Sequence, residues 1–151
     1  MRARLLLGFT LLVLAACGRA DHGASEAGIS VAGAWARPSF PPHENAAAFL
    51  ELTNGNDTAD ALIGLSVGRA AVAELHTMEV DENDVMRMRP VERMELPPGE
   101  TLTLKPGADH LMFFELDGQW KIGEEIHMVL HFEHAENLRV VAKVEPMDAH
   151  R

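Results

Sequence analysis

Two histidines and two methionines, His76, Met88, His110 and Met112, have the residue types and the spacing of a metal site, in the pattern His-x11-Met-x21-His-x-Met. Thioether sulfur is a soft ligand with little affinity for Mg²⁺ or Ca²⁺, and together with imidazole it favours Cu(I) over harder divalent ions. His110 and Met112 are two residues apart, so on a β-strand both side chains project from one face while Leu111 points away. We therefore predict that these four residues bind one copper ion.

The other methionines and histidines need a separate interpretation. A methionine on a strand fills the core more often than it binds a metal, and this is how we interpret Met128. Met78 and Met86 lie on the same predicted strand faces as His76 and Met88, so we keep both as secondary candidate contacts. The histidines of the last predicted hairpin are interpreted as solvated, with a weaker Cu(II) or Zn²⁺ site as the alternative. They are His127, His131 and His134.

Short strands separated by turns rich in Gly and Pro must position these side chains. Apolar and polar residues alternate along residues 126–132 and again along 138–144, as expected for a hairpin with one buried face. Many short strands with such turns indicate an all-β sandwich or barrel. Residues 59–75 are alanine-rich, and their composition would also tolerate a helical turn. The remaining predicted strands are residues 30–36, 47–52, 71–78, 85–89, 101–104 and 110–116.

The candidate ligands impose a condition on the hairpin that contains the first two of them. His76 and Met88 share a face only if the numbers of cross-strand partners sum to an even number, as when 76 pairs with 88. A four-residue loop would instead place Thr77 opposite Met88. We therefore predict a loop with an odd number of residues, or a bulge, around residues 81–83.

The order and intervals of these residues resemble those of the periplasmic copper chaperones called PCu(A)C, whose motif is written H(M)x10Mx21HxM. The optional Met after the first His is Thr77 in this chain. The similarity covers about residues 28–145. It includes Ala-Trp-Ala-Arg at 34–37, Glu-Leu-His at 74–76, Met-Arg-Met-Arg-Pro at 86–90 and Leu-Lys-Pro-Gly at 104–107.

This resemblance implies a fold and a role. The fold is a single domain with a cupredoxin-like Greek-key β-sandwich. The role is that of a Cu(I) metallochaperone, with no enzymatic activity, that delivers copper to a cuproenzyme. The acceptor implied by the family is cytochrome c oxidase, at its dinuclear copper site, with a Sco-type thiol protein as a further partner.

The N-terminus has the features of a bacterial lipoprotein signal. Arg2 and Arg4 precede residues 5–16, a mostly apolar stretch that is shorter than the roughly 20 residues a membrane span needs. Leu-Ala-Ala-Cys at residues 14–17 resembles the lipobox, so we predict that Cys17 is lipidated. An ordinary signal peptide with an incidental cysteine is the alternative.

These features divide the chain into four parts. Residues 1–16 are the signal peptide, 17–27 the lipidated cysteine and a small, polar tether, 28–147 the copper-binding domain, and 148–151 a tail. The length of the third part is typical of one domain. We expect a monomer in the periplasm or cell envelope, attached to a membrane only through its lipid.

Charge and cysteine content exclude several classes of function. Removal of residues 1–16 leaves 11 Lys and Arg against 23 Asp and Glu, a net charge of −12 with neutral His. Nucleic acid is therefore excluded as a partner, and a basic protein surface is favoured. Because Cys17 is the only cysteine, the domain cannot form a disulfide, a Cys-based zinc site or a blue-copper centre.

The sequence leaves two alternative functions open. In the first, His76 and His110 hold a catalytic metal with an open coordination position. The sequence contains no His-Glu-x-x-His motif and no phosphate-binding glycine loop to support such an enzyme. In the second, the protein sequesters copper and delivers none, which the chemistry of the ligands does not distinguish from delivery.

Overall fold

The computed structural model describes residues 28–42 and 45–149. The predicted signal peptide, the lipidation site Cys17 and the tether lie outside the described residues. Within them, no helix is long and apolar enough to cross a membrane.

The described residues form ten β-strands and no helix. The strands are β1 (Ile29–Ala36), β2 (Asn45–Asn54), β3 (Asp60–Val67), β4 (Ala70–Val80), β5 (Met86–Val91), β6 (Met94–Leu96), β7 (Thr101–Leu104), β8 (His110–Leu116), β9 (Glu125–Phe132) and β10 (Leu138–Val144).

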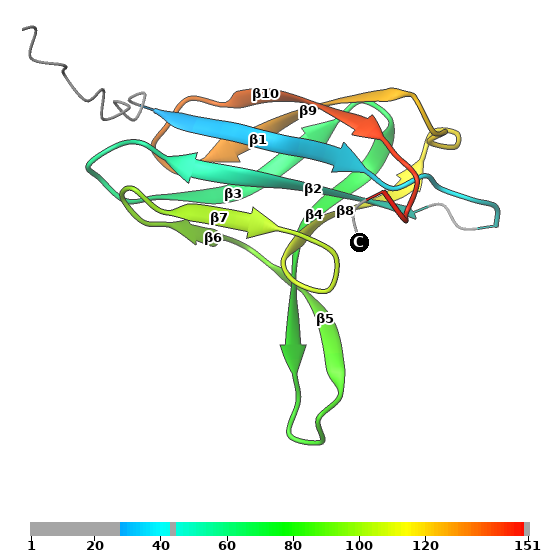
Figure 1. Cartoon of the computed structure of the whole chain (residues 1–151), viewed down its shortest axis with the longest axis horizontal. Coiled ribbons are helices and arrows are strands. Elements are labelled where there is room, and N and C mark those ends of the chain that lie inside the picture. Colours follow the sequence, from blue (N-terminus) through cyan, green and yellow to red (C-terminus); the bar gives the residue numbers. More distant parts are fainter. Residues whose placement is uncertain (1–27, 43–44, 150–151) are drawn as a thin grey trace, which may run out of the picture.

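One continuous hydrogen-bonded sheet contains all of these strands, in the order β5-β4-β8-β2-β1-β10-β9-β3-β6, with β7 paired to β2. The sheet folds over on itself, so that β3 and β4 come into contact although they are far apart in this order (Figure 1). Strand β1 links the two halves, because it pairs antiparallel with β2 and parallel with β10. The predicted all-β sandwich, in a single domain, is confirmed.

The main core lies between the two halves of the folded sheet. From β8, Leu111 and Phe113 are fully buried in it, and the ring of Phe113 lies 4.9 Å from that of Trp120. Each such side chain contributes roughly 1.5–3 kcal/mol through burial. Because side chains alternate along a strand, this leaves His110 and Met112 on the opposite face.

Two strands differ from the sequence-based prediction. Residues 59–75 contain β3 and the start of β4, and no helical turn. Alanine there is compatible with a strand because both faces of β3 are covered at its start, where Ala61 and Leu62 are fully buried. The three-residue strand β6 was also not predicted. The other strands lie within two residues of their predicted ends.

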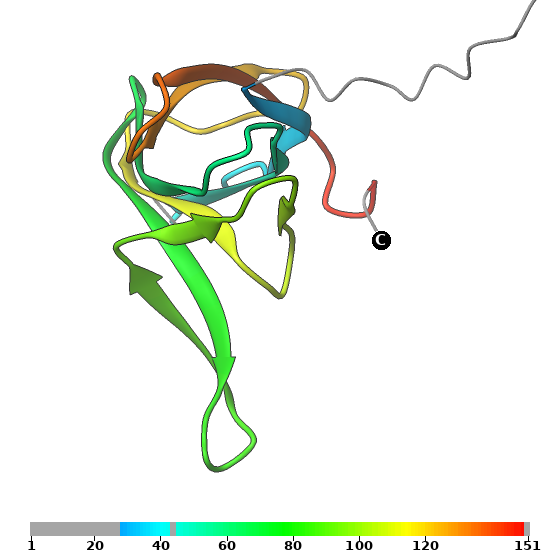
Figure 2. The same ribbon diagram turned by 90° about the vertical axis from the view of Figure 1, so that its left-hand side faces the viewer.

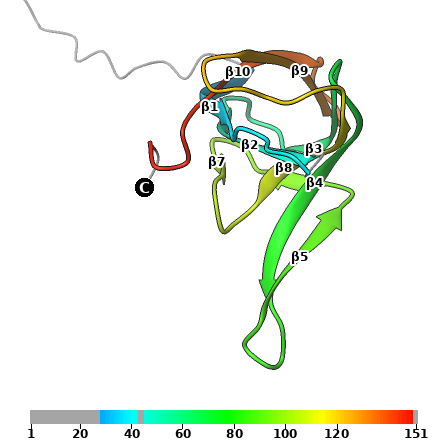
Figure 3. The same ribbon diagram turned by 90° about the vertical axis from the view of Figure 1, so that its right-hand side faces the viewer.

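The hairpin of β4 and β5 extends beyond the body of the sandwich, as three views agree (Figures 1, 2 and 3). Strand β5 is an edge strand whose only partner in the described sheet is β4. The first part of β4 is different, since it pairs with β8 within the body. The outer part of this hairpin therefore forms an exposed arm, and its base is part of the sandwich.

Candidate metal centre

Three strand pairings bring the candidate ligands to one face of the sheet. His76 on β4 is the register partner of His110 on β8, and Met112 is the partner of Ala47 on β2. Directly paired residues on antiparallel strands point to the same side. We call this side the site face; it is the one opposite the main core.

The register of the β4–β5 hairpin places Met88 on the site face as well. Its register partner is Met78, while His76 pairs with Pro90, so His76 and Met88 lie diagonally across the hairpin. The last backbone hydrogen bond of the pair joins Asp81 and Val85, which leaves a loop of three residues. The predicted odd loop is confirmed, although no direct 76–88 pair is formed.

The conformation of this loop is fixed by one carboxylate. Oδ1 of Asp81 accepts hydrogen bonds from the backbone N–H of Asn83 at 2.8 Å and of Val85 at 3.0 Å. Its Oδ2 accepts one from Nε of Arg87 at 2.6 Å. These bonds hold the pKa of Asp81 below its ordinary value, the Arg87 bond having the largest effect. Asp84 adopts φ of 59°, a left-handed conformation that short polar residues tolerate.

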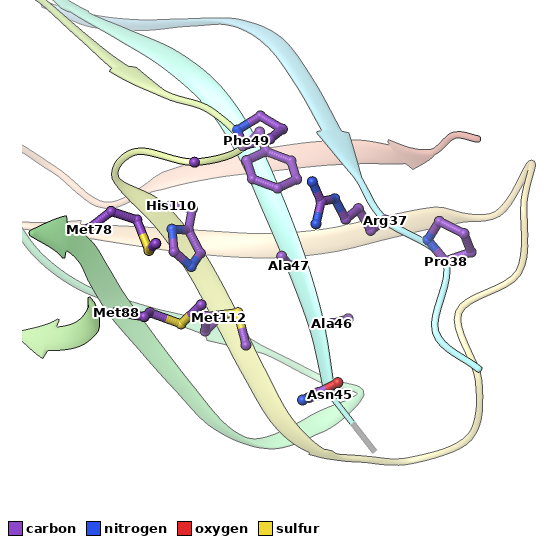
Figure 4. A pocket seen from close by; sticks show the side chains of 12 residues that line it. Arg37, Pro38, Asn45, Ala46, Ala47, Phe49, Met78, Met88, His110 and Met112 are labelled. Carbon is purple, nitrogen blue, oxygen red and sulfur yellow. The ribbon is translucent and has the colours of Figure 1, made fainter. Parts of the chain in front are cut away.

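A pocket of about 290 Å³ opens on the site face. Met78, Met88, His110 and Met112 line one side of it, and their side chains lie close together (Figure 4). The exposed fractions differ greatly among them, since His110 is 5% exposed, Met112 9% and Met88 48%. The pocket thus has a buried wall on β8 and an exposed wall on the hairpin.

His110 is oriented by the turn that precedes it. Its Nδ1 lies 2.7 Å from the carbonyl oxygen of Ala108, which can only accept, so Nδ1 carries the proton and Nε2 carries a free lone pair. Burial lowers the pKa of His110, and the hydrogen bond to Ala108 opposes this only in part. A neutral imidazole with one nitrogen anchored is the form in which histidine binds metals.

His76 is oriented by a carboxylate. Its Nε2 donates to Oε2 of Glu74 at 2.8 Å, and its Nδ1 is buried without a hydrogen-bond partner. An unpaired buried nitrogen is unfavourable unless a ligand occupies it. The His76 ring lies 5.8 Å from the ring of His110 and 5.9 Å from that of Phe114. His76 is 6% exposed and does not line the pocket, whereas Met78 and Met88 of the hairpin do.

Aromatic side chains support the buried wall. The ring of Phe49 lies 4.5 Å from that of Trp35 and 6.3 Å from that of His110, and the guanidinium of Arg37 lies 5.2 Å from its centroid. A β-bulge directs Trp35 to the site face, because the register of β1 shifts by one residue after Ala32. Gly33, at φ of 59°, supplies the left-handed backbone at this bulge.

The other candidate residues, Met86 and the histidines of the last hairpin, do not line the pocket. Met86 shares the site face but is 54% exposed and does not line the pocket. Nε2 of His131 lies 3.1 Å from the hydroxyl of Ser66, and His134 is exposed. Among the described residues, no three or more His, Cys, Asp or Glu side chains form a group that could hold a metal ion. We therefore retain the methionines as candidate donors on the site face.

The chain matches a known protein family and a lipoprotein relative. Residues 29–144, most of the described part, match the family described as "Putative lipoprotein LpqE-like". The chain belongs to this LpqE-like family. A relative, "Putative lipoprotein Lxx21020" from Leifsonia xyli subsp. xyli (strain CTCB07), is 26% identical over 145 residues, covering 95% of this chain and 86% of that protein.

Solved structures with the same fold include two that contain copper. The solution structure of CuI-DR1885 from Deinococcus radiodurans has 28% sequence identity and a TM-score of 0.61, and the match covers 90% of this chain and 89% of that chain. The copper-bound PCuAC domain from PmoF2 has a TM-score of 0.67 and 23% identity, covering 78% of this chain and 92% of that chain. The second likeness concerns the fold alone. The LpqE-like chain therefore has the fold of a PCuAC domain.

Proposed function

We propose that this protein is a copper carrier that binds one Cu(I) through His76, Met88, His110 and Met112 and transfers it to an acceptor protein. The observation that carries the proposal is the juxtaposition of two imidazoles, each with one free nitrogen, and two thioethers on one face of the sheet. Such a neutral, soft donor set favours Cu(I). The similarity to CuI-DR1885 supports this choice of metal.

Transfer, rather than permanent storage, is supported by the exposure of one ligand. Met88 is half exposed on an arm that extends from the body, while the other three ligands are buried. The pocket beside them is several times larger than the roughly 30 Å³ that one water molecule occupies in the liquid. A side chain of an acceptor therefore has room to enter and take the ion by ligand exchange, without unfolding the donor.

The acceptor we propose is cytochrome c oxidase, at its dinuclear copper site, with a Sco-type protein as helper. The test is deletion of the gene in its own host, followed by oxidase assays under copper limitation. Loss of oxidase activity, restored by the wild-type gene and not by Met88→Leu/Met112→Leu, supports delivery. Loss of copper tolerance with normal oxidase activity would instead show that the protein sequesters copper.

Attachment to the cell envelope through Cys17 is part of the same proposal. The lipoprotein description of the family and of the Leifsonia relative supports it, as does the lipobox-like sequence at residues 14–17. Two acyl chains hold a protein on a membrane, whereas one holds it only weakly. Cys17→Ser is expected to move the protein from the membrane fraction to the soluble envelope fraction. If the variant stays with membranes, lipidation of Cys17 is not the anchor.

A further inference from the structure

We propose that Met78 is a third thioether donor of the same site, which takes the place of His76 on the ion while copper is being released. The inference rests on the proposed function, because it assumes that copper binds on the site face. It assigns a role to a residue that lies outside the His-x11-Met-x21-His-x-Met pattern.

The position of Met78 carries the argument. Met78 is the direct register partner of Met88, and both side chains line the pocket with His110 and Met112. Figure 4 shows the two hairpin methionines extending toward this pair from the same side. His76, by contrast, pairs with Pro90, is buried, and does not line the pocket.

The structure thus offers two donor sets that share three members. Met88, His110 and Met112 are common to both, and the fourth donor is either the buried His76 or the partly exposed Met78. His76 is 6% exposed, so an ion held with it would have little access to solvent on that side. An ion held with Met78 lies nearer to the pocket opening, where a donor group of the acceptor can reach it.

The exchange involves no redox step and no proton transfer. One bond from copper to Nδ1 of His76 breaks, and one bond from copper to the Met78 sulfur forms. The nitrogen keeps its lone pair, the thioether has no proton to lose, and the charge of the site is unchanged. His76 meanwhile remains hydrogen-bonded to Glu74, so the vacated ring has a defined position to which the ion can return.

Met86 provides a matched control on the same hairpin. It pairs with Val80, two residues further along the hairpin than the Met78–Met88 pair, and therefore lies on the same face as Met78. It is exposed and does not line the pocket. A leucine at either position keeps the apolar volume and removes the sulfur, so the two variants differ only in where the sulfur is lost.

The experiment is a double-mutant cycle on the purified protein, with Cu(I) affinity measured by competition with a chelator. Met78→Leu alone is expected to change the affinity by no more than about twofold, because His76 still completes the site. In the His76→Leu background it is expected to lower the affinity by about tenfold or more, because the substitute donor is then lost. Met86→Leu is expected to have little effect in either background. Equal, small effects of Met78→Leu in both backgrounds would overturn the proposal.

A second readout serves if His76→Leu fails to fold. Transfer of Cu(I) to excess chelator is followed in stopped flow for the wild type, Met78→Leu and Met86→Leu. Slower transfer from Met78→Leu only is expected, and equal rates from all three would contradict the role of Met78. Failure of the proposed function would appear separately, as a wild type that does not bind Cu(I) with both nitrogen and sulfur ligands.

Discussion

His76 and His110 lie directly opposite each other on the adjacent antiparallel strands β4 and β8, with ring centroids 5.8 Å apart. Each ring has one nitrogen engaged, by the Glu74 carboxylate in one case and by the Ala108 carbonyl in the other. The ring nitrogens that these contacts leave available are Nδ1 of His76 and Nε2 of His110. Each histidine is therefore oriented by a hydrogen-bond partner outside the proposed ligand set.

Glu74 is expected to act as a positioning residue for His76. Glu74→Ala removes the acceptor that fixes the tautomer, and loss of such a partner typically lowers metal affinity about 10- to 100-fold. Glu74→Gln, which can still accept the hydrogen bond, is expected to recover part of the affinity. The control is Glu79→Ala on the opposite face of β4, where the carboxylate pairs with Arg89. A Cu(I) affinity that is equal in Glu74→Ala and Glu79→Ala would remove this role.

The folding stability of the copper-free protein is expected to depend on pH through His110. Its pKa is lowered in the folded state by burial, so below the ordinary value of about 6.5 the unfolded chain binds more protons than the folded one. The contribution of His110 to stability is complete above that value and declines as the pH falls below it. In chemical unfolding experiments, the free energy of unfolding should fall more between pH 7.5 and pH 5.5 for the wild type than for His110→Gln. An equal fall in the free energy of unfolding for both proteins would contradict this role of His110.

Asp60 is expected to stabilise the fold far from the metal centre. Burial tends to raise its pKa, but hydrogen bonds from the backbone N–H groups of Ala61, Ala135 and His134 outweigh burial and lower it. Asp60→Asn should reduce the free energy of unfolding at pH 7 by about 1–3 kcal/mol. The difference is present above the unfolded pKa of about 3.9 and disappears as the pH falls through the lower folded value. The exposed Asp57→Asn is the control, and an equal effect of both variants would refute the prediction.

The parity of the β4–β5 loop is expected to be essential for copper binding. One glycine inserted after Asn83 is expected to shift the register by one residue, because pairing of Asp81 with Asp84 keeps a loop of three residues, and this shift turns Met88 to the opposite face. We expect Cu(I) affinity to fall as far as in Met88→Leu, while the thermal stability of the body stays close to that of the wild type. Unchanged affinity would mean that the register does not select the ligand.

From the sequence it was possible to predict which residues share the site face, but not which of them pair directly. The alternating patterns identified most strands, and the requirement that His76 and Met88 share a face predicted the odd loop. Whether Met78 or His76 lies opposite Met88 was beyond prediction, because both registers have the same parity. Strand β3 was missed because Asp60, Ala61 and Leu62 are all buried, so the alternation that marks a half-buried strand is absent at its start.

The hydrogen-bond partners of the two histidines also differ in predictability. Glu74 lies two residues before His76, and this spacing alone places both on one face of a strand, so the contact was available from the sequence. The partner of His110 depends on the turn before β8, where Gly107 adopts φ of 78° and Lys105 N–H bonds to the carbonyl of Asp109. No periodicity encodes such a turn. The bulge at Gly33 is a similar case.

The most direct test of the account is a Cu(I) titration of the purified protein against a competing chelator under reducing conditions, with X-ray absorption on the loaded sample. We predict one tightly bound equivalent and a first shell of both nitrogen and sulfur. Met88→Leu/Met112→Leu should lose most of the sulfur signal and most of the affinity. Weak binding by the wild type, or a shell of nitrogen and oxygen alone, would contradict the proposed copper site.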